Sequence, residues 1–169
     1  CAICLARAGV GTLVIADFDV VEISNLSRQY YFSDQTGRPK VIALQQNINR
    51  INPDIRVIPY QVKLDAGNIP VIFKGCNLIV EAFDRADMKE MLIDTVQREM
   101  PGVALIVGSG IAGWGKSEDI KCRKIDDSLY ICGDETLETS EELPPVAPRV
   151  SMVASMQANL AVELLMKMN

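Results

Sequence analysis

Two acidic side chains follow an apolar run near the start of the chain, in the segment Asp17-Phe18-Asp19. The preceding run, Thr12 to Ala16, predicts a buried strand. In an open parallel sheet, ligands bind beyond the carboxyl ends of the strands, where an acid commonly hydrogen-bonds a ribose hydroxyl. Asp17 stands at that place, and its position alone fits a ribose-binding acid or a turn acid equally well.

Two basic side chains, Arg28 and Lys40, lie in the segment that follows. Arg28 belongs to a long polar and aromatic loop from Glu22 to Pro39, and Lys40 begins a predicted helix. A cation in the first turn of a helix opposes the helix dipole unless an anion is present. Arg offers a planar fork and Lys a point charge, so both could converge on one phosphate. The alternative is an ordinary solvated basic face.

A third candidate, Asp84, follows the apolar run Leu78 to Val80 in the segment Glu81-Ala82-Phe83-Asp84-Arg85. A carboxylate beside a triphosphate typically holds magnesium through one or two oxygens. The same residue could instead cap the helix that follows. Both interpretations stay open from the sequence.

The chain contains no histidine, which excludes Ser-His-Asp triads, histidine metal sites and histidine general bases. The first two of its five cysteines form a C-x-x-C that is expected to line one helix face, with no second pair at zinc spacing. We therefore predict no zinc. An odd number of cysteines without a disulfide framework fits a reducing cytoplasm. The cysteines are Cys1, Cys4, Cys76, Cys122 and Cys132.

Composition and charge further narrow the class of protein to which the chain can belong. Hydrophobic residues make up 49% of the 169 residues, as in a globular protein. No apolar run approaches the roughly 20 residues of a membrane span, and no signal peptide is evident. The formal charge of -5 argues against a nucleic-acid partner. These features predict a cytoplasmic protein that binds neither nucleic acid nor membrane.

The elements that would position these residues alternate along the chain. Strands that are apolar throughout, alternating with helices, predict an α/β fold with a Rossmann-like, doubly wound, mostly parallel sheet and helices on both faces. Strands are expected at 12–16, 55–62, 78–80 and 103–107, and helices at 1–8, 40–51, 66–73, 87–100 and 149–168.

The rest of the chain is less regular. Residues 116–131 are expected to form short extended segments, and 133–148 an acidic, proline-containing surface loop. The chain opens in what reads as the end of a helix, so an N-terminal strand and a glycine-rich loop would precede Cys1 and are missing from this chain. We expect a single ATP-binding domain over residues 1–169.

Several ordered motifs together resemble the ThiF/MoeB/HesA family of ubiquitin-activating-enzyme-like proteins, most closely the compact second type of ThiF. The resemblance covers nearly the whole chain, with 117–143 matching weakly. The motifs are Asp17-Phe18-Asp19-Val20-Val21-Glu22, Ser24-Asn25-Leu26-Ser27-Arg28-Gln29, Gly37-Arg38-Pro39-Lys40, Asn52-Pro53, and Ala147-Pro148-Arg149-Val150 with Gln157-Ala158 and Glu163-Leu164-Leu165.

This resemblance implies a role for each matching residue. Asp17 would hold the ribose of ATP, with Asp19 beside it among the ATP-binding residues. Lys40 would neutralise the reacting phosphate, and Asp84 would position Mg²⁺. The residues implied to contact the phosphates are Asn25, Arg28 and Gln29, with Arg28 as the main charge.

The resemblance also implies an activity and partners. The protein would use ATP to adenylate the C-terminal carboxylate of a small ubiquitin-like sulfur-carrier protein, ThiS-like and ending in Gly-Gly, in thiamine biosynthesis. It would act as a homodimer, a prediction that the methionines spread over several faces of the last helix also favour. These methionines are Met152, Met156, Met166 and Met168.

Two other functions fit parts of the sequence. A Rossmann oxidoreductase would explain Asp17 but would leave Arg28, Lys40 and Asp84 without a shared task. A non-catalytic nucleotide-binding or scaffold subunit of the same superfamily would bind without turnover. The chain also departs from the family pattern at Arg85, where Asn or Ser is usual.

Two cysteines are candidates for a covalent link to the carrier. Cys132 begins the acidic loop, although Asp134 and Glu135 would raise its pKa. Cys122 lies between two basic residues that would favour its thiolate. Neither matches the family's cysteine motif, so we expect adenylation to need no cysteine.

Overall fold

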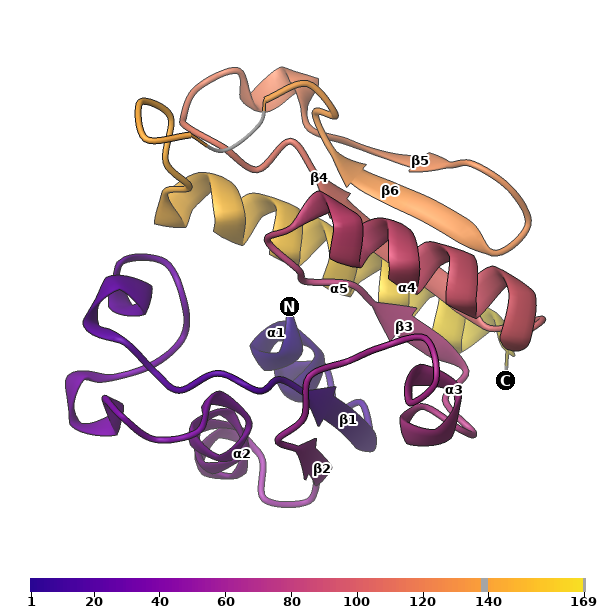
Figure 1. The fold of residues 1–169 in the computed structure, drawn as a ribbon, viewed down its shortest axis with the longest axis horizontal. Helices are drawn as coiled ribbons and strands as arrows, with labels where there is room; N and C mark the ends of the chain where they lie inside the picture. Colours follow the sequence, from indigo (N-terminus) through magenta and orange to yellow (C-terminus); the bar gives the residue numbers. More distant parts are fainter. Residues whose placement is uncertain (138–139, 169) are drawn as a thin grey trace. The chain divides into compact units, whose positions relative to one another are not determined.

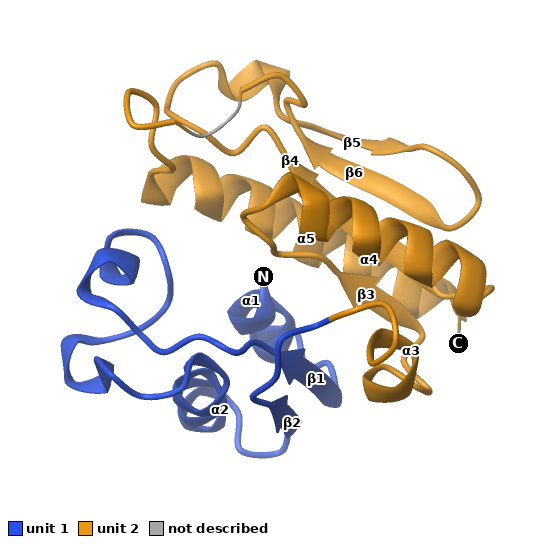
Figure 2. Ribbon diagram, viewed as in Figure 1, with its two compact units in different colours: residues 1–64 blue, residues 65–169 orange. Residues whose placement is uncertain are grey.

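The computed structural model describes residues 1–137 and 140–168. The internal packing divides the chain into two compact units, residues 1–64 and residues 65–169 (Figure 2). Each unit combines helices with parallel strands, which confirms the predicted α/β class. The single ATP-binding domain over residues 1–169 stays a prediction.

Unit 1 is built around two parallel strands, β1 and β2 (Figure 1). Their register runs from Thr12 opposite Arg56 to Ala16 opposite Tyr60. The elements are α1 (Ala2–Arg7), β1 (Thr12–Ala16), the 3₁₀ turns η1 (Ile23–Ser27) and η2 (Ser33–Gln35), α2 (Lys40–Ile51) and β2 (Arg56–Tyr60).

The core of unit 1 joins both helices to the strands. Ala6 of α1, Ile48 of α2 and Ile55 before β2 are buried together. Leu44, one turn before Ile48, packs against the same cluster, as helical spacing requires. The extended backbone of Asn52, which precedes a proline, ends α2 and lets the chain turn back into β2.

Unit 2 contains a four-stranded sheet in the order β3-β4-β6-β5. The strands β3, β4 and β6 are parallel, and β5 pairs with β6 in antiparallel orientation. The elements are α3 (Ile69–Ile72), β3 (Leu78–Val80), α4 (Ala86–Glu99), β4 (Ala104–Ser109), η3 (Ser117–Asp119), β5 (Lys121–Lys124), β6 (Leu129–Gly133) and α5 (Ala147–Met168).

Strand β4, one of the two inner strands of this sheet, is covered on both faces. Consecutive residues Ala104 to Val107 of β4 are all buried, and alternate residues of a strand point to opposite faces. Helix α5 packs against β3, β4 and β6, and α4 packs against β4 (Figure 1). An apolar run therefore marks β4 because both of its faces are in the core.

Helix α3 is shorter than the predicted helix over 66–73. The Asp65 carboxylate accepts hydrogen bonds from the backbone N–H groups of Gly67 at 2.9 Å and Asn68 at 2.8 Å. This Asx turn holds residues 65–68, so the helix begins only at Ile69.

Among the described helices, none has the length and apolar character that crossing a membrane requires.

Candidate functional site

The carboxyl end of β1 brings three of the predicted site residues together. The Asp17 carboxylate accepts a hydrogen bond from the Asp19 backbone N–H at 2.8 Å, which turns the chain as it leaves the strand. Lys40 Nζ lies 2.8 Å from Asp19 Oδ2, and the Lys40 backbone N–H donates to the Asp19 carbonyl at 2.9 Å. Residues 21 positions apart in the sequence thus share one small polar cluster.

Lys40 carries its positive charge at the N-terminus of a helix, where the helix dipole disfavours a cation. It is the first residue of α2, and its side chain is only 11% exposed, whereas that of Asp19 is 46% exposed. The positive end of the helix dipole disfavours an ammonium here. Asp19 supplies the compensating charge in the structure, and a phosphate could take over that role because the carboxylate is open to solvent.

Tyr31 is a member of this environment that the sequence analysis missed. Burial raises the pKa of its hydroxyl, and the nearby carboxylates of Asp17 and Asp19 raise it further. The phenol therefore stays protonated at neutral pH and keeps a hydrogen-bond donor near two acids. A tyrosine in an aromatic loop carries no sequence signal for this role.

The predicted phosphate-contacting residues lie in and directly after the turn η1. Asn25 is buried, and its side-chain oxygen accepts a hydrogen bond from the Glu22 backbone N–H at 3.0 Å. The Asn25 carbonyl in turn accepts from the backbone N–H groups of Arg28 at 3.1 Å and Gln29 at 2.8 Å. Asn25 therefore organises the turn, and phosphate contacts by Asn25 and Gln29 stay predictions.

The Arg28 guanidinium folds back over its own turn. Its Nη1 donates to the Ser24 carbonyl at 3.1 Å and reaches Ser27 Oγ at 3.5 Å. Both contacts are with neutral, exposed groups, so an anion would be a stronger partner.

A buried amide pair fixes this loop on α2. Gln35 Nε2 donates to Asn47 Oδ1 at 2.8 Å, and Asn47 Nδ2 donates to the Tyr30 carbonyl at 2.9 Å. Both side chains are buried, where a paired amide stabilises one loop conformation. The polar residues of the loop are thereby held beside the first turns of α2.

In unit 2, Asp84 follows β3 and is exposed. The N-cap residue of α4 is Arg85, not Asp84, and the Arg85 side chain makes no cap hydrogen bond. The helix-cap interpretation of Asp84 is therefore not supported. The Arg85 side chain bonds to Asp87, two residues further along the chain, with Nε 3.0 Å from Asp87 Oδ1.

An ion pair between a buried carboxylate and a half-buried lysine supports the turn that carries Asp84. The side chain of Glu81 is 0% exposed, and both of its carboxylate oxygens lie 2.8 Å from Lys89 Nζ. Glu81 also accepts hydrogen bonds from the backbone N–H groups of Phe83 and Gly108. Lys89 Nζ donates to the Gly108 carbonyl at 3.0 Å, so the pair joins the ends of β3 and β4 to α4. Neither Glu81 nor Lys89 carries a signal in the sequence that predicts this pair.

Desolvation by burial raises the pKa of Glu81, although Lys89 and the backbone donors act in the opposite direction. Removing a carboxylate from water is thus only partly offset by its partners.

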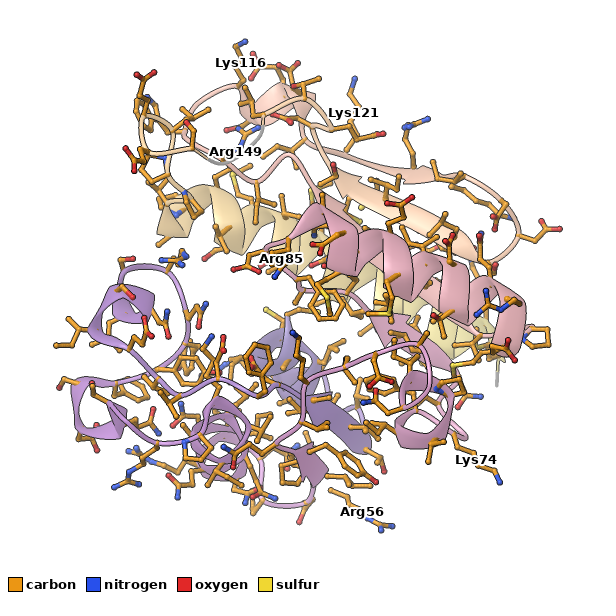
Figure 3. All side chains as sticks on the ribbon, viewed as in Figure 1. Arg56, Lys74, Arg85, Lys116, Lys121 and Arg149 are labelled. Atoms are coloured by element: carbon orange, nitrogen blue, oxygen red, sulfur yellow. The ribbon has the colours of Figure 1, made fainter. Side chains whose placement is uncertain are left out.

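A second buried pair organises the start of α5. The Arg149 guanidinium, labelled in Figure 3, bonds to the Asp134 carboxylate and donates to the Gly115 carbonyl at 2.7 Å. The Asp134 carboxylate also accepts from the backbone N–H groups of Thr136 and Leu137. A Cβ on Gly110 would stand 1.9 Å from Asp134 Oδ1, so this packing requires glycine there.

Both candidate cysteines, Cys122 and Cys132, lie in the hairpin formed by β5 and β6. Cys132 is fully buried in β6, so it does not sit on a surface loop as predicted. Burial raises the pKa of its thiol most, and contact with Cys122 adds to this rise. The two acidic neighbours cited from the sequence are not the cause. Cys132 is therefore shielded from molecules in solution, whereas Cys122 is exposed.

The possible metal ligands of this chain are its carboxylates and thiols, because it contains no histidine. Across residues 1–137 and 140–168, no group of three or more Cys, Asp or Glu side chains is placed to hold a metal ion by itself. Magnesium usually takes one or two protein carboxylates and completes its shell with water and phosphate oxygens. An exposed single carboxylate such as Asp84 fits that kind of site.

Comparison with known proteins defines the class. The model of the ThiF family matches residues 1–169, and the chain belongs to this family. The chain is 34% identical over 167 residues to the molybdopterin-synthase adenylyltransferase of Salmonella typhimurium, covering 95% of this chain and 66% of that protein. It is 29% identical over 172 residues to the sulfur carrier protein ThiS adenylyltransferase of Bacillus subtilis, covering 95% and 49%.

The fold also resembles a solved structure. The tRNA N6-threonylcarbamoyladenosine dehydratase of Escherichia coli, determined in complex with ATP, has a TM-score of 0.80 and 18% identity, covering 99% of this chain and 82% of that one. This likeness concerns the fold. The chain spans 66% or less of the two adenylyltransferases described above.

Proposed function

We propose that this protein uses ATP to adenylate the C-terminal carboxylate of a small ubiquitin-like sulfur-carrier protein. The observation that carries the proposal is the Lys40–Asp19–Asp17 cluster at the carboxyl end of β1. Family membership and relatives named as adenylyltransferases support it. The ATP complex of a protein with this fold supports a nucleotide as ligand.

The residues of unit 1 suit this reaction. The carrier carboxylate attacks the α-phosphorus of ATP, an acyl-phosphate bond forms, and the bond to the leaving pyrophosphate breaks. The carboxylate is already ionised at pH 7, so no general base is needed. Lys40 exchanges Asp19 for a phosphate oxygen, Arg28 leaves its neutral partners for another, and Asp17 accepts from the ribose. Positioning and charge neutralisation then lower the barrier.

Asp84 would hold magnesium in this scheme. Its carboxylate is exposed, and the cap of α4 does not engage it. When bound, the ion supplies positive charge to the triphosphate. Glu81 and Lys89 hold the turn from which Asp84 projects.

The carrier, pathway, assembly and location belong to the same proposal. A ThiS-like carrier ending in Gly-Gly and a role in thiamine biosynthesis follow from the resemblance to ThiF. A cytoplasmic homodimer is also proposed, in which the 169 residues act as one ATP-binding domain. The dimer is supported by exposed apolar side chains on α5, namely Met152, Met166 and Met168.

Pyrophosphate exchange tests the proposal. We expect the full chain to catalyse exchange of labelled pyrophosphate into ATP only when a carrier with an intact Gly-Gly terminus is present. A ThiS-like carrier, a molybdopterin-synthase carrier and each carrier without its final Gly are compared. Nucleotide binding without exchange with either intact carrier would favour a scaffold subunit. Hydride transfer from a nicotinamide cofactor would favour an oxidoreductase.

A further inference from the structure

Two cysteines from different strands face each other in the β5–β6 hairpin. The antiparallel register places Cys122 opposite Cys132. Directly opposed residues point to the same face of a sheet. Both cysteines are reduced in this structure.

The ladder shows which kind of cross-strand pair they form. The Ile125 backbone N–H donates to the Leu129 carbonyl at 2.9 Å, so these residues form a hydrogen-bonded pair. Hydrogen-bonded and non-hydrogen-bonded pairs alternate along an antiparallel ladder. In the observed register, the Cys122–Cys132 pair lies three residue pairs along the ladder from the Ile125–Leu129 pair. Because the two kinds of pair alternate, Cys122 and Cys132 form a non-hydrogen-bonded pair. Side chains approach most closely at such pairs.

This geometry lies near that of a disulfide. Opposed Cβ atoms at such a pair are about 4.5 Å apart, and a disulfide requires roughly 3.5–4.5 Å. The remaining adjustment falls on β5, the edge strand, whose four residues are all exposed. An edge strand can move by a few tenths of an ångström without disturbing a core.

The two thiols also differ in accessibility. Cys122 is exposed and lies between Lys121 and Arg123 on the edge strand β5. Figure 3 shows Lys121 at the start of β5. Cys132 is buried. An oxidant from solvent therefore meets Cys122 first, and Cys132 can respond only through Cys122.

We propose that Cys122 and Cys132 are a reversible dithiol–disulfide site that reacts with small-molecule disulfides of the glutathione type. The Cys122 thiolate attacks one sulfur of the small disulfide, forming a mixed disulfide and releasing one thiolate. The Cys132 sulfur, giving up its proton, then attacks the Cys122 sulfur and releases the second small thiol. One small disulfide is reduced to two thiols, and one protein disulfide forms. Excess thiol reverses both steps.

The test uses oxidised glutathione and mass spectrometry with peptide mapping. We expect the wild-type chain to lose two hydrogens at this pair and to retain no glutathione there. Dithiothreitol should restore the original mass. A variant with serine in place of the other three cysteines should behave in the same way, which separates this pair from Cys1, Cys4 and Cys76.

Single substitutions make the order of attack visible. Cys132→Ser should stop at a stable mixed disulfide on Cys122, and Cys122→Ser should leave Cys132 unmodified in the folded protein. The proposal is overturned if wild type accumulates the same stable glutathione adduct on Cys122 as Cys132→Ser does. It is equally overturned if Cys132 reacts without Cys122 while circular dichroism shows a folded chain.

Discussion

Replacing Lys89 with methionine should destabilise the protein strongly and in a pH-dependent way. The change removes the cationic partner of Glu81, whose side chain is 0% exposed, and leaves its carboxylate in the core with backbone donors alone. Breaking a buried ion pair from one side typically costs about 3–5 kcal/mol. For a chain of this size the unfolding midpoint should fall by on the order of 10 °C.

The pH dependence follows from the pKa of Glu81, which burial raises above its usual value in the folded state. Between the unfolded and folded pKa values, the folded state binds more protons, so stability falls as the pH rises through this window. Lys89 lowers the folded pKa, so its loss should extend the window to higher pH. The deficit of Lys89→Met should therefore grow as the pH rises, and it should be smallest at acidic pH, where Glu81 is protonated in both proteins.

Urea unfolding of wild type and Lys89→Met at several pH values measures this deficit. Lys167→Met is the matched control, because it removes a lysine from an exposed helical pair with Glu163, which typically contributes about 0.3–0.5 kcal/mol. Adding Glu81→Gln to Lys89→Met should recover part of the loss, since the buried charge is then gone. Equal costs for the two lysine variants, or a deficit independent of pH, would refute the reasoning.

Three further predictions concern the proposed site and the second buried pair. Lys40→Ala should abolish pyrophosphate exchange and leave the unfolding midpoint within a few degrees, because the Asp19 left behind is solvated; Arg38→Ala, which removes an exposed basic residue bonded to a glutamine, is the control and should retain activity. Asp84→Asn should lower exchange by roughly a hundredfold, in line with the 10²–10³ lost when one transition-state group is removed, and extra magnesium should restore part of it; a loss indifferent to magnesium would remove Asp84 from the metal site. Arg149→Met should cost roughly 3 kcal/mol by urea unfolding, the lower end for a broken buried pair, because its acidic partner keeps two backbone donors; a cost below 1 kcal/mol would contradict this.

Local patterns were sufficient to predict most of the elements. The apolar runs before Asp17 and Asp84 are strands, and α2 begins at Lys40 and ends at Ile51 as expected. The position of Asp17 and Asp19 at the end of β1 was also predictable from the sequence, since ligand-binding residues gather where parallel strands end. The spacing of apolar residues and the residues that end helices and strands are sufficient to predict these features to within a few residues.

Features that depend on pairing between distant residues could not be predicted in this way. Glu81 and Lys89 read as an ordinary strand-end acid and a solvated helix lysine, and only the fold shows that Lys89, half-buried, pairs with a fully buried Glu81. The same holds for the Gln35–Asn47 amide pair. Polar residues acquire such roles from the tertiary structure, because sequence composition does not show which of them will lose contact with water.

The pairing of the two cysteines depends on the register between β5 and β6, which the sequence alone does not determine. The spacing of Cys122 and Cys132 gives no sign of contact until the hairpin turn and the ladder are known. A shift of one residue would place the two thiols on opposite faces. Cys132 therefore read as a loop residue, although β6 continues one residue further, to Gly133.

The central claim is that the β1-end cluster serves carboxylate adenylation. Its most direct test is pyrophosphate exchange by wild type and Lys40→Ala with a Gly-Gly-terminated carrier. We expect carrier-dependent exchange by wild type and a loss of roughly a hundredfold or more in Lys40→Ala, since one charge contact that forms in the transition state is removed. Exchange by Lys40→Ala at the wild-type rate would contradict the role of the cluster. Absence of exchange by folded, ATP-binding wild type with every intact carrier would contradict the activity itself.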